Sequence, residues 1–312
     1  WHAYLTMTVV GSGMALDMPS RRSIIHDFLG HAGLANGIAL DTVGMQASKM
    51  AGPALAGLLI MLVNVSGGYV VVAALYATAF VIVIRINVPA RLPNISRSDR
   101  HSIVSQASEG MRYSFSHQTL RAVFAVTIVT NLMLFPYMQM VPVIAKDILM
   151  VGPGLMGLLM AADGIGALIG SLGIASRHTI KRHGAIFLGG SLIAMAALMA
   201  FSISHWYVVS LALLLILGLG ISGFASMQST IVILVSRENM RGRALGVLSL
   251  AIGANPFGSL LIGLSASTLG VPLAIGINAG VGITALTIVA LVSPLMRQVL
   301  GSALAGTKTQ RS

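Results

Sequence analysis

The chain alternates between long apolar blocks and short polar connections. A helix that crosses about 30 Å of hydrocarbon needs roughly 20 mostly apolar residues, whereas a membrane-spanning strand needs about 10 residues of alternating polarity. The uniformly apolar blocks therefore predict helices, and with them an all-α, polytopic membrane protein. We place nine such blocks near 2–18, 37–62, 68–86, 122–145, 153–175, 185–203, 206–235, 244–266 and 270–295.

The composition supports the same class of protein. Of the 312 residues, 56% are hydrophobic and only 9% are charged, whereas soluble domains carry about 25% charged residues. This composition excludes a soluble enzyme, a disordered chain and a nucleic-acid-binding domain. We therefore expect the chain to lie in a lipid bilayer. The chain has no Cys, which excludes disulfides, thiolate metal sites and Cys nucleophiles.

The basic residues predict the orientation of the chain in the membrane. When the connections are assigned alternately to the two sides, 17 of the 19 Lys and Arg residues fall on one side; Lys146 lies on the other side and Lys49 inside a block. Cytoplasmic loops carry the basic excess, so this side, together with the C-terminus, is predicted to be cytoplasmic. The net charge of +11 is therefore a signal of topology, and we expect no nucleic-acid partner.

The longest connection, 87–121, divides the chain. Its first part, 89–99, is rich in Pro, Asn, Ser and Arg and reads as a linker. Its second part has apolar residues at a spacing of four, which predicts an amphipathic helix along the cytoplasmic surface; they are Ile103, Ala107, Met111 and Phe115. We divide the chain into the remainder of an N-terminal helix bundle (1–86), this connector (87–121), a C-terminal six-helix bundle (122–296) and a cytoplasmic tail (297–312).

Several short motifs resemble one family. Their order and spacing are similar to those of the major facilitator superfamily, in particular the bacterial transmembrane secretion effector group that includes enterobactin exporters. The loop at 170–184 departs from the family pattern because it keeps basic residues without the expected acid. The motifs are Asp17-Met-Pro-Ser-Arg-Arg, Leu34-Ala-Asn-Gly-Ile-Ala-Leu, Gly52-Pro-Ala-Leu-Ala-Gly57, Glu109-Gly-Met-Arg-Tyr113, Arg241-Gly-Arg243 and Asn255-Pro-Phe-Gly258.

The resemblance implies a fold of two six-helix bundles around a central cavity, which rock to give alternating access. It maps the nine blocks to helices four to twelve of twelve, so three N-terminal helices are expected to be missing, and this chain alone is not expected to transport. The implied function is secondary active export, driven by protons, of a small amphipathic compound of the drug or siderophore type. We expect a monomer in the bacterial cytoplasmic (inner) membrane. An importer of the same fold and a non-transporting fragment remain alternatives.

Gly52, Pro53 and Gly57, with Gly44, resemble the motif that antiporters of the family carry in their fifth helix. Pro53 removes one backbone hydrogen bond and favours a bend, and glycines allow helices to approach closely. The motif predicts a seal or pivot between the bundles; ordinary tight packing is the alternative.

Lys49 and Asp163 are the charges nearest the middle of the membrane. A charge there costs about 2.5–3.5 kcal/mol on insertion scales and usually faces a cavity or a partner. The resemblance puts the two residues on helices that face each other, which implies an ion pair or a proton-binding carboxylate beside a cation. A buried pair without a transport role is the alternative. For Asp41 we favour a structural role near the cytoplasmic helix end, and Asp17 resembles the acidic partner of the family's signature loop.

Polar residues inside the blocks are candidates for lining the cavity or for joining helices. They are Asn131, Gln139, Gln228, Asn255 and Asn278. Arg241 and Arg243 belong to the predicted cytoplasmic surface.

Two motifs match patterns of enzymes, but their position in the chain argues against an enzymatic function. The pattern Gly218-x-Gly220-x-x-Gly223 matches a dinucleotide fingerprint but follows no strand and lies inside a predicted membrane helix. Ser222 matches the serine motif of an intramembrane hydrolase, which needs a base within reach, yet every His lies in a connection or at the end of a block. We therefore expect no enzyme, no cofactor and no metal.

The predicted topology can be tested with reporter fusions. Fusions at Asn94, His178 and Ser302 should report the cytoplasm, and fusions at Ser66 and Gly152 should report the exterior, because the basic residues divide so unequally between the two sides. A cytoplasmic signal at Gly152 would overturn the assignment of blocks.

Overall fold

The computed structural model describes residues 1–85, 103–176 and 182–293, and every regular element in these ranges is helical. For many residues between 2 and 50, for 103–107 and for Asn239 it describes the backbone alone. The elements in chain order are α1 (His2–Arg85), α2 (Ile103–Ser116), α3 (Gln118–Val129), η1 (Thr130–Leu134), η2 (Phe135–Gln139), α4 (Val141–Val143), η3 (Ile144–Ile148), α5 (Pro153–Ala175), α6 (His183–Ser202), α7 (Tyr207–Val235), η4 (Glu238–Met240), α8 (Arg241–Ile252), α9 (Asn255–Leu269) and α10 (Val271–Val292).

Seven helices of the described ranges are long and apolar enough to cross a membrane. One of them, Ala51–Arg85, covers the end of the second predicted block and the third block. The all-α, polytopic fold is thus confirmed, while the count of nine spans stays a prediction. The other six correspond in order to the six blocks predicted between 122 and 295; they are Gln118–Ile148, Pro153–Ala175, His183–Ser202, Tyr207–Val235, Arg241–Leu269 and Val271–Val292.

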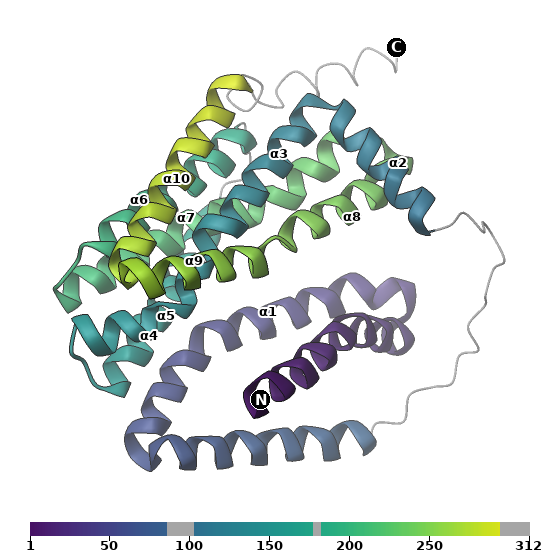
Figure 1. The fold of residues 1–312 in the computed structure, drawn as a ribbon. Coiled ribbons are helices and arrows are strands. Elements are labelled where there is room, and N and C mark those ends of the chain that lie inside the picture. Colours follow the sequence, from purple (N-terminus) through teal and green to yellow (C-terminus); the bar gives the residue numbers. More distant parts are fainter. Residues whose placement is uncertain (86–102, 177–181, 294–312) are drawn as a thin grey trace, which may run out of the picture.

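The long helix α1 is not straight. Figure 1 shows it doubling back on itself, so that its last part runs along one edge of the molecule. Asn64 has a φ of 61°, a left-handed conformation that interrupts a regular right-handed helix. Asn64 lies between the blocks predicted at 37–62 and 68–86, so the backbone turns where the pattern of apolar residues placed a connection.

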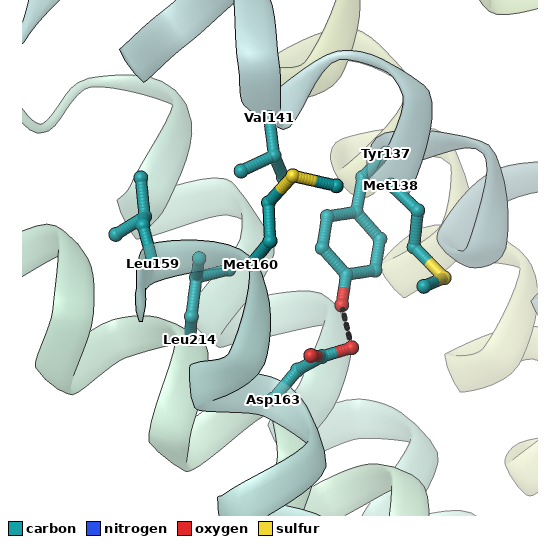
Figure 2. A pocket seen from close by; sticks show the side chains of 7 residues that line it. All are labelled: Tyr137, Met138, Val141, Leu159, Met160, Asp163 and Leu214. Carbon is teal, nitrogen blue, oxygen red and sulfur yellow. Dashed lines mark hydrogen bonds between the residues drawn. The ribbon is translucent and has the colours of Figure 1, made fainter. Parts of the chain in front are cut away.

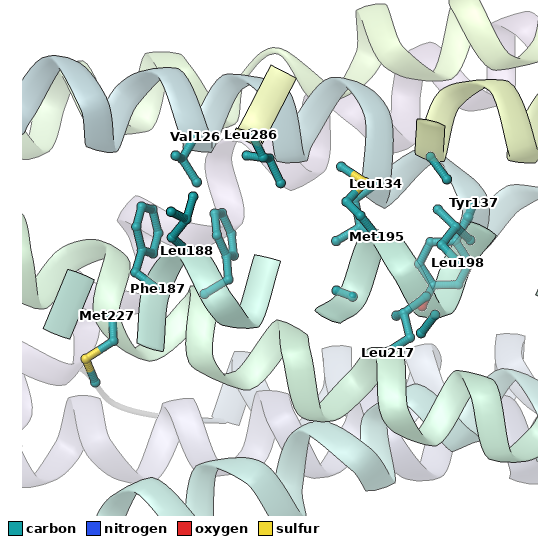
Figure 3. Packing of buried hydrophobic residues seen from close by; sticks show 14 of the residues in the cluster. Val126, Leu134, Tyr137, Phe187, Leu188, Met195, Leu198, Leu217, Met227 and Leu286 are labelled. Atoms are coloured by element: carbon teal, nitrogen blue, oxygen red, sulfur yellow. The ribbon is translucent and has the colours of Figure 1, made fainter. Parts of the chain in front are cut away.

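The buried core lies in the second half of the chain, between Leu120 and Ala290. Its side chains come from α3, the segment that follows it, α5 to α7, and α8 to α10. Figure 3 shows members from α3, η1, η2, α6, α7 and α10. Phe187 of α6 stacks on Phe224 of α7 with ring centroids 5.3 Å apart, and Phe135 of η2 contacts the same ring at 6.0 Å. These residues join the consecutive helices α6 and α7 to η2, which lies about 50 residues earlier in the chain.

Helix α7 packs closely against two neighbours because glycines lie where the backbones meet. A Cβ placed on Gly218 would collide with the carbonyl oxygen of Asp163 in α5. A Cβ placed on Gly220 would lie 2.5 Å from the carbonyl oxygen of Gly190 in α6, and one on Gly223 would lie 2.9 Å from that of Ile186. The pattern that matches a dinucleotide fingerprint is therefore a surface for packing helices.

The connector contains the predicted amphipathic helix, which is α2. It crosses the ends of α3 and α8 instead of running along them (Figure 1). The linker predicted at 89–99 and the tail predicted at 297–312 lie outside the described residues.

The packing around α7 predicts unequal effects of two Gly→Ala substitutions. Gly220→Ala should lower the thermal midpoint of unfolding in detergent by several degrees, since overpacking costs about 1–3 kcal/mol. The matched control is Gly280→Ala in α10, where an added Cβ meets no described atom within 4 Å. Ala is favoured over Gly in a helix by about 0.5–1 kcal/mol, so the control should keep or raise the midpoint. Equal midpoints for the two variants would contradict the close packing of α6 and α7.

Candidate functional site in the second helix bundle

The first span of the second bundle is not a regular α-helix. After α3 the backbone becomes a π-helix over Thr130–Leu134 and a 3-10 helix over Phe135–Gln139, and a second π-helix covers Ile144–Ile148. Pro136 and Pro142 lie within this segment, and each lacks the N–H that a regular helix requires. Such interruptions are frequent at functional sites. The two prolines were the sequence signal for this break, and the blocks alone did not reveal it.

The 3-10 segment brings Tyr137 to Asp163. The Tyr137 hydroxyl donates a hydrogen bond of 2.7 Å to Asp163 Oδ2, and the backbone N–H of Gly164 donates one of 2.8 Å to Oδ1. Tyr137 is almost fully buried and Asp163 is partly buried. Figure 2 shows the pair at the edge of a small, otherwise apolar pocket. The remaining lining residues are Met138, Val141, Leu159, Met160 and Leu214.

Helix α9 holds the same interrupted segment from another side. Gln139 Nε2 donates to Ser259 Oγ at 3.0 Å, and Ser259 Oγ lies 3.4 Å from Asn255 Oδ1. A Cβ on Gly258 would collide with the carbonyl oxygen of Leu132. Asn255, a predicted cavity or helix-joining residue, therefore belongs to a chain of polar side chains that reaches η2.

A second polar group lies deeper in the bundle, between α3 and α7. Gln228 Nε2 donates to Thr127 Oγ1 at 3.0 Å, and Asn131 Nδ2 donates to the Thr127 carbonyl oxygen at 2.9 Å. All three residues are buried. Gln228 therefore joins two helices, while the hydrogen bond from Asn131 to Thr127 stays within one helical turn. The Nδ2 group of Asn278 and the hydroxyl of Thr130 are buried without a hydrogen-bond partner in the described structure.

Helix α1 crosses α5 at two similar sequences, Pro53–Gly57 and Pro153–Gly157. A Cβ placed on Gly57 would lie 2.5 Å from the Pro153 carbonyl oxygen, and one placed on Gly157 would lie 2.5 Å from the Pro53 carbonyl oxygen. The contact is reciprocal and the two helices run antiparallel there. Of the predicted motif, Pro53 and Gly57 make this contact, whereas a Cβ on Gly44 or Gly52 meets no described atom within 4 Å.

Two of the motifs that carry the family resemblance contact each other at one end of the bundle. Arg243 Nη1 lies 2.6 Å from Glu109 Oε1, and the backbone N–H of Arg237 donates to the Tyr113 hydroxyl at 3.0 Å. Arg241 Nε donates to the Ile233 carbonyl oxygen at 3.2 Å near the end of α7. Arg243 therefore fastens α2 to α8, and Arg241 satisfies a carbonyl group near a helix end. The spacing of the motifs did not reveal this contact.

The remaining predicted charges lie in α1. Asp17 is exposed and Asp41 is partly buried. The side chain of Lys49 lies outside the described side chains, so its pairing with Asp163 stays a prediction.

These observations describe a bundle of apolar helices with an interrupted helix, a partly buried acid and a close crossing to helix α1. A model of the transmembrane secretion effector family matches residues 2–304. The chain belongs to this family, a branch of the major facilitator superfamily. No curated protein matches the sequence. Membership in the family, together with the membrane-spanning helices, identifies the chain as a membrane transporter protein with a small-molecule substrate.

The crossing of α1 and α5 in this transporter can be tested by cross-linking, which is straightforward because the chain has no Cys of its own. The probe pair is Met61→Cys with Gly154→Cys, since a Cβ on Gly154 would lie 3.4 Å from the Met61 sulfur. Adding Gly57→Val should slow cross-linking by a short bifunctional thiol reagent about tenfold, because the valine forces the backbones apart.

The matched control for this measurement is Gly52→Val, one residue before Pro53 on the same helix. Its Cβ meets no described atom, so cross-linking should proceed as in the parent pair. Equal rates in the Gly57 and Gly52 variants would show that the crossing is not close.

Proposed function

We propose that this transporter exports small amphipathic compounds in exchange for protons, by alternating access of two helix bundles, and that Asp163 binds the proton. The observation that carries the proposal is the hydrogen bond of 2.7 Å between Tyr137 and Asp163. It puts an ionisable group, near the middle of the 23-residue helix α5, in contact with the segment whose helical hydrogen bonds are interrupted.

Proton binding at Asp163 would change the chemistry of this contact. An ionised carboxylate only accepts hydrogen bonds, so Tyr137 must donate; a protonated carboxyl group can itself donate. Protonation would also remove the charge that strengthens the bond. Taking up a proton would therefore loosen the link between α5 and η2, and releasing it would tighten the link. Because η2 is followed by a second irregular stretch, a small change there can alter the whole segment up to Ile148.

Lys49 is the cation that we propose to act with Asp163. Continuing the antiparallel register of Pro53–Gly57 and Pro153–Gly157 by about one turn brings these two residues to a similar depth. A carboxyl group that meets an ammonium group in one state and apolar surroundings in another takes up and releases a proton as the surroundings change. On this proposal, Lys49→Ala also impairs coupling.

The crossing between α1 and α5 is the proposed pivot. A Cβ on Gly57 or on Gly157 would overlap the backbone of the other helix, so the two backbones approach closely there, and we propose that the helices rotate against each other at this contact. The contacts of Arg241 and Arg243 lie at the end of the bundle that the basic residues predict to be cytoplasmic. We propose that this end keeps its shape while the crossing opens and closes.

One observation argues against an intramembrane hydrolase, and one measurement distinguishes an importer from an exporter. For an intramembrane hydrolase, Ser222 would need a base, yet its hydroxyl donates to the carbonyl oxygen of Leu219 at 2.7 Å within its own helix. An importer of the same fold uses the same groups, and the direction of the driving gradient distinguishes it from an exporter.

We propose a monomer in the bacterial inner membrane with a cytoplasmic C-terminus.

The proposal predicts the effect of removing the acid. In the full-length transporter, reconstituted in proteoliposomes with an imposed pH gradient, Asp163→Asn should abolish gradient-driven efflux, because the amide cannot take up a proton in this range, while substrate binding changes less than about twofold. Tyr137→Phe keeps the acid and removes a hydrogen bond to a charged group, worth about 1.5–3 kcal/mol, so efflux should persist but slow about tenfold.

The matched control is Asp147→Asn, which makes the same chemical change at an exposed acid near the end of a span. It should transport like the parent. Full gradient-driven efflux by the Asp163 variant would mean that Asp163 is a structural residue and that protons are bound elsewhere. Net uptake under the same gradient would favour the importer.

A further inference from the structure

Helix α2 presents apolar side chains outside any membrane-spanning segment. Met111 is 42% exposed and Phe115 is 55% exposed, although α2 precedes the first span of the second bundle. The preceding neighbour of each, Gly110 and Ser114, is buried. Exposed apolar residues are expected on the spans of a membrane protein, but on a connector they need a partner of their own.

The rotation of α2 about its axis is determined by contacts with the second bundle. Glu109 forms the ion pair of 2.6 Å with Arg243, and Tyr113 accepts the backbone N–H of Arg237. A Cβ on Gly110 would lie 3.1 Å from both the Cβ and the carbonyl oxygen of Arg243. This face of the helix is therefore occupied, and turning Met111 and Phe115 inward would break all three contacts.

The remaining circumference of α2 divides into two sectors. Successive residues of an α-helix are about 100° apart, so Met111 and Phe115 lie next to the face that carries Gly110 and Ser114. Arg112 and Ser116 follow about 100° further round and are exposed. The helix thus has one side toward the bundle, one apolar side and one polar side. This is the arrangement of a helix that lies in a membrane surface beside a protein.

Positive charge lies on α2 and next to it. Arg112 belongs to α2, the backbone of Arg121 binds that of His117 directly after α2, and the backbone of Arg237 binds Tyr113 of α2. All three Arg side chains are exposed and have no ion pair among the described residues, whereas the two acids of this region, Glu109 and Glu238, lie within 4.0 Å of Arg243 and Arg241. An uncompensated cluster of Arg beside exposed apolar side chains fits anionic lipid headgroups. It does not fit a second copy of this chain, which would bring the same positive charges together.

We propose that α2 lies in the headgroup layer of the leaflet on the basic side of the protein, with Met111 and Phe115 among the upper acyl chains and Arg112 and Arg121 on anionic headgroups. Since α2 crosses the ends of α3 and α8 (Figure 1), the lipid would bind where the connector meets the second bundle. The proposal is independent of the proton site and of the direction of transport.

The test uses the fluorescence of one tryptophan in the full chain. The chain has two Trp residues, Trp1 and Trp206, which are replaced by Phe. Phe115→Trp is then reconstituted in vesicles of phosphatidylcholine with phosphatidylglycerol, whose acyl chains are brominated near the headgroup. Its fluorescence should fall at least about twofold relative to unbrominated vesicles, as for an interfacial side chain. The matched control, Ser116→Trp on the polar side, should change little.

A second comparison tests the choice of anionic lipid. Replacing phosphatidylglycerol by phosphatidylcholine should reduce the quenching of the Phe115→Trp protein, and Arg112→Gln with Arg121→Gln should remove this lipid dependence. Met111→Cys labelled with an environment-sensitive dye gives an independent reading: its emission should shift to the blue in anionic vesicles.

Equal quenching at positions 115 and 116, or none at 115, would overturn the membrane position. Equal quenching of the Phe115→Trp protein in vesicles with and without phosphatidylglycerol would overturn the proposal that the bound lipid is anionic. A blue shift of the dye emission that an added soluble protein causes and anionic vesicles do not would overturn the proposal in favour of a protein partner.

Discussion

The backbones of neighbouring helices meet without intervening side chains at several points of this bundle, and glycine is present at each of them. Lipid tails are as apolar as the helices, so burial of apolar surface cannot hold helices together inside a membrane as it does in water. Association depends instead on van der Waals contact and on polar bonds, both of which require close approach. α7 meets this requirement twice, with Gly218 toward α5 and Gly220 toward α6. The crossing of α1 and α5 uses the same device. There the glycines Gly57 and Gly157 each face the backbone of the other helix.

The second constraint is that polar groups in the bilayer must find partners inside the protein. Thr127 serves two of them, Asn131 and Gln228. Asp163 has Tyr137 and the backbone of Gly164. The interruption of the helix around Pro136 and Pro142 increases the number of polar groups that need partners, since it removes regular backbone hydrogen bonds within a candidate membrane span. α9 compensates by packing against the interrupted segment, and its Ser259 accepts a hydrogen bond from Gln139 of that segment. The irregular segment is thus held from several sides, and the hydrogen bond from Tyr137 to Asp163 is one of these contacts.

At the basic end of the bundle the connector is part of the same structure. The two family motifs around Glu109 and Arg243 lie far apart in sequence and contact each other through an ion pair. Partly exposed ion pairs are worth little by themselves, about 0.2–1 kcal/mol. The pair gains importance from its neighbours, because Gly110 packs on Arg243 and Tyr113 binds the backbone of Arg237. Together these contacts set the rotation of α2, and the rotation decides that Met111 and Phe115 face away from the protein.

The amino-acid sequence by itself determined the membrane class of the protein, the six apolar spans predicted between 122 and 295, the amphipathic helix in the connector and the family. All of these follow from local features: the length of an apolar run, the spacing of apolar residues and the order of short motifs. Only the tertiary structure decided which residues meet. The blocks did not show that Tyr137 reaches Asp163, that Gly57 packs on α5 while Gly52 does not, or that Glu109 binds Arg243. Each of these contacts depends on the rotation of a helix about its axis and on which helix lies beside it. The pattern of apolar residues predicts neither the rotation nor the neighbour. Inside a membrane, an apolar face of a helix can be covered by lipid as well as by another helix.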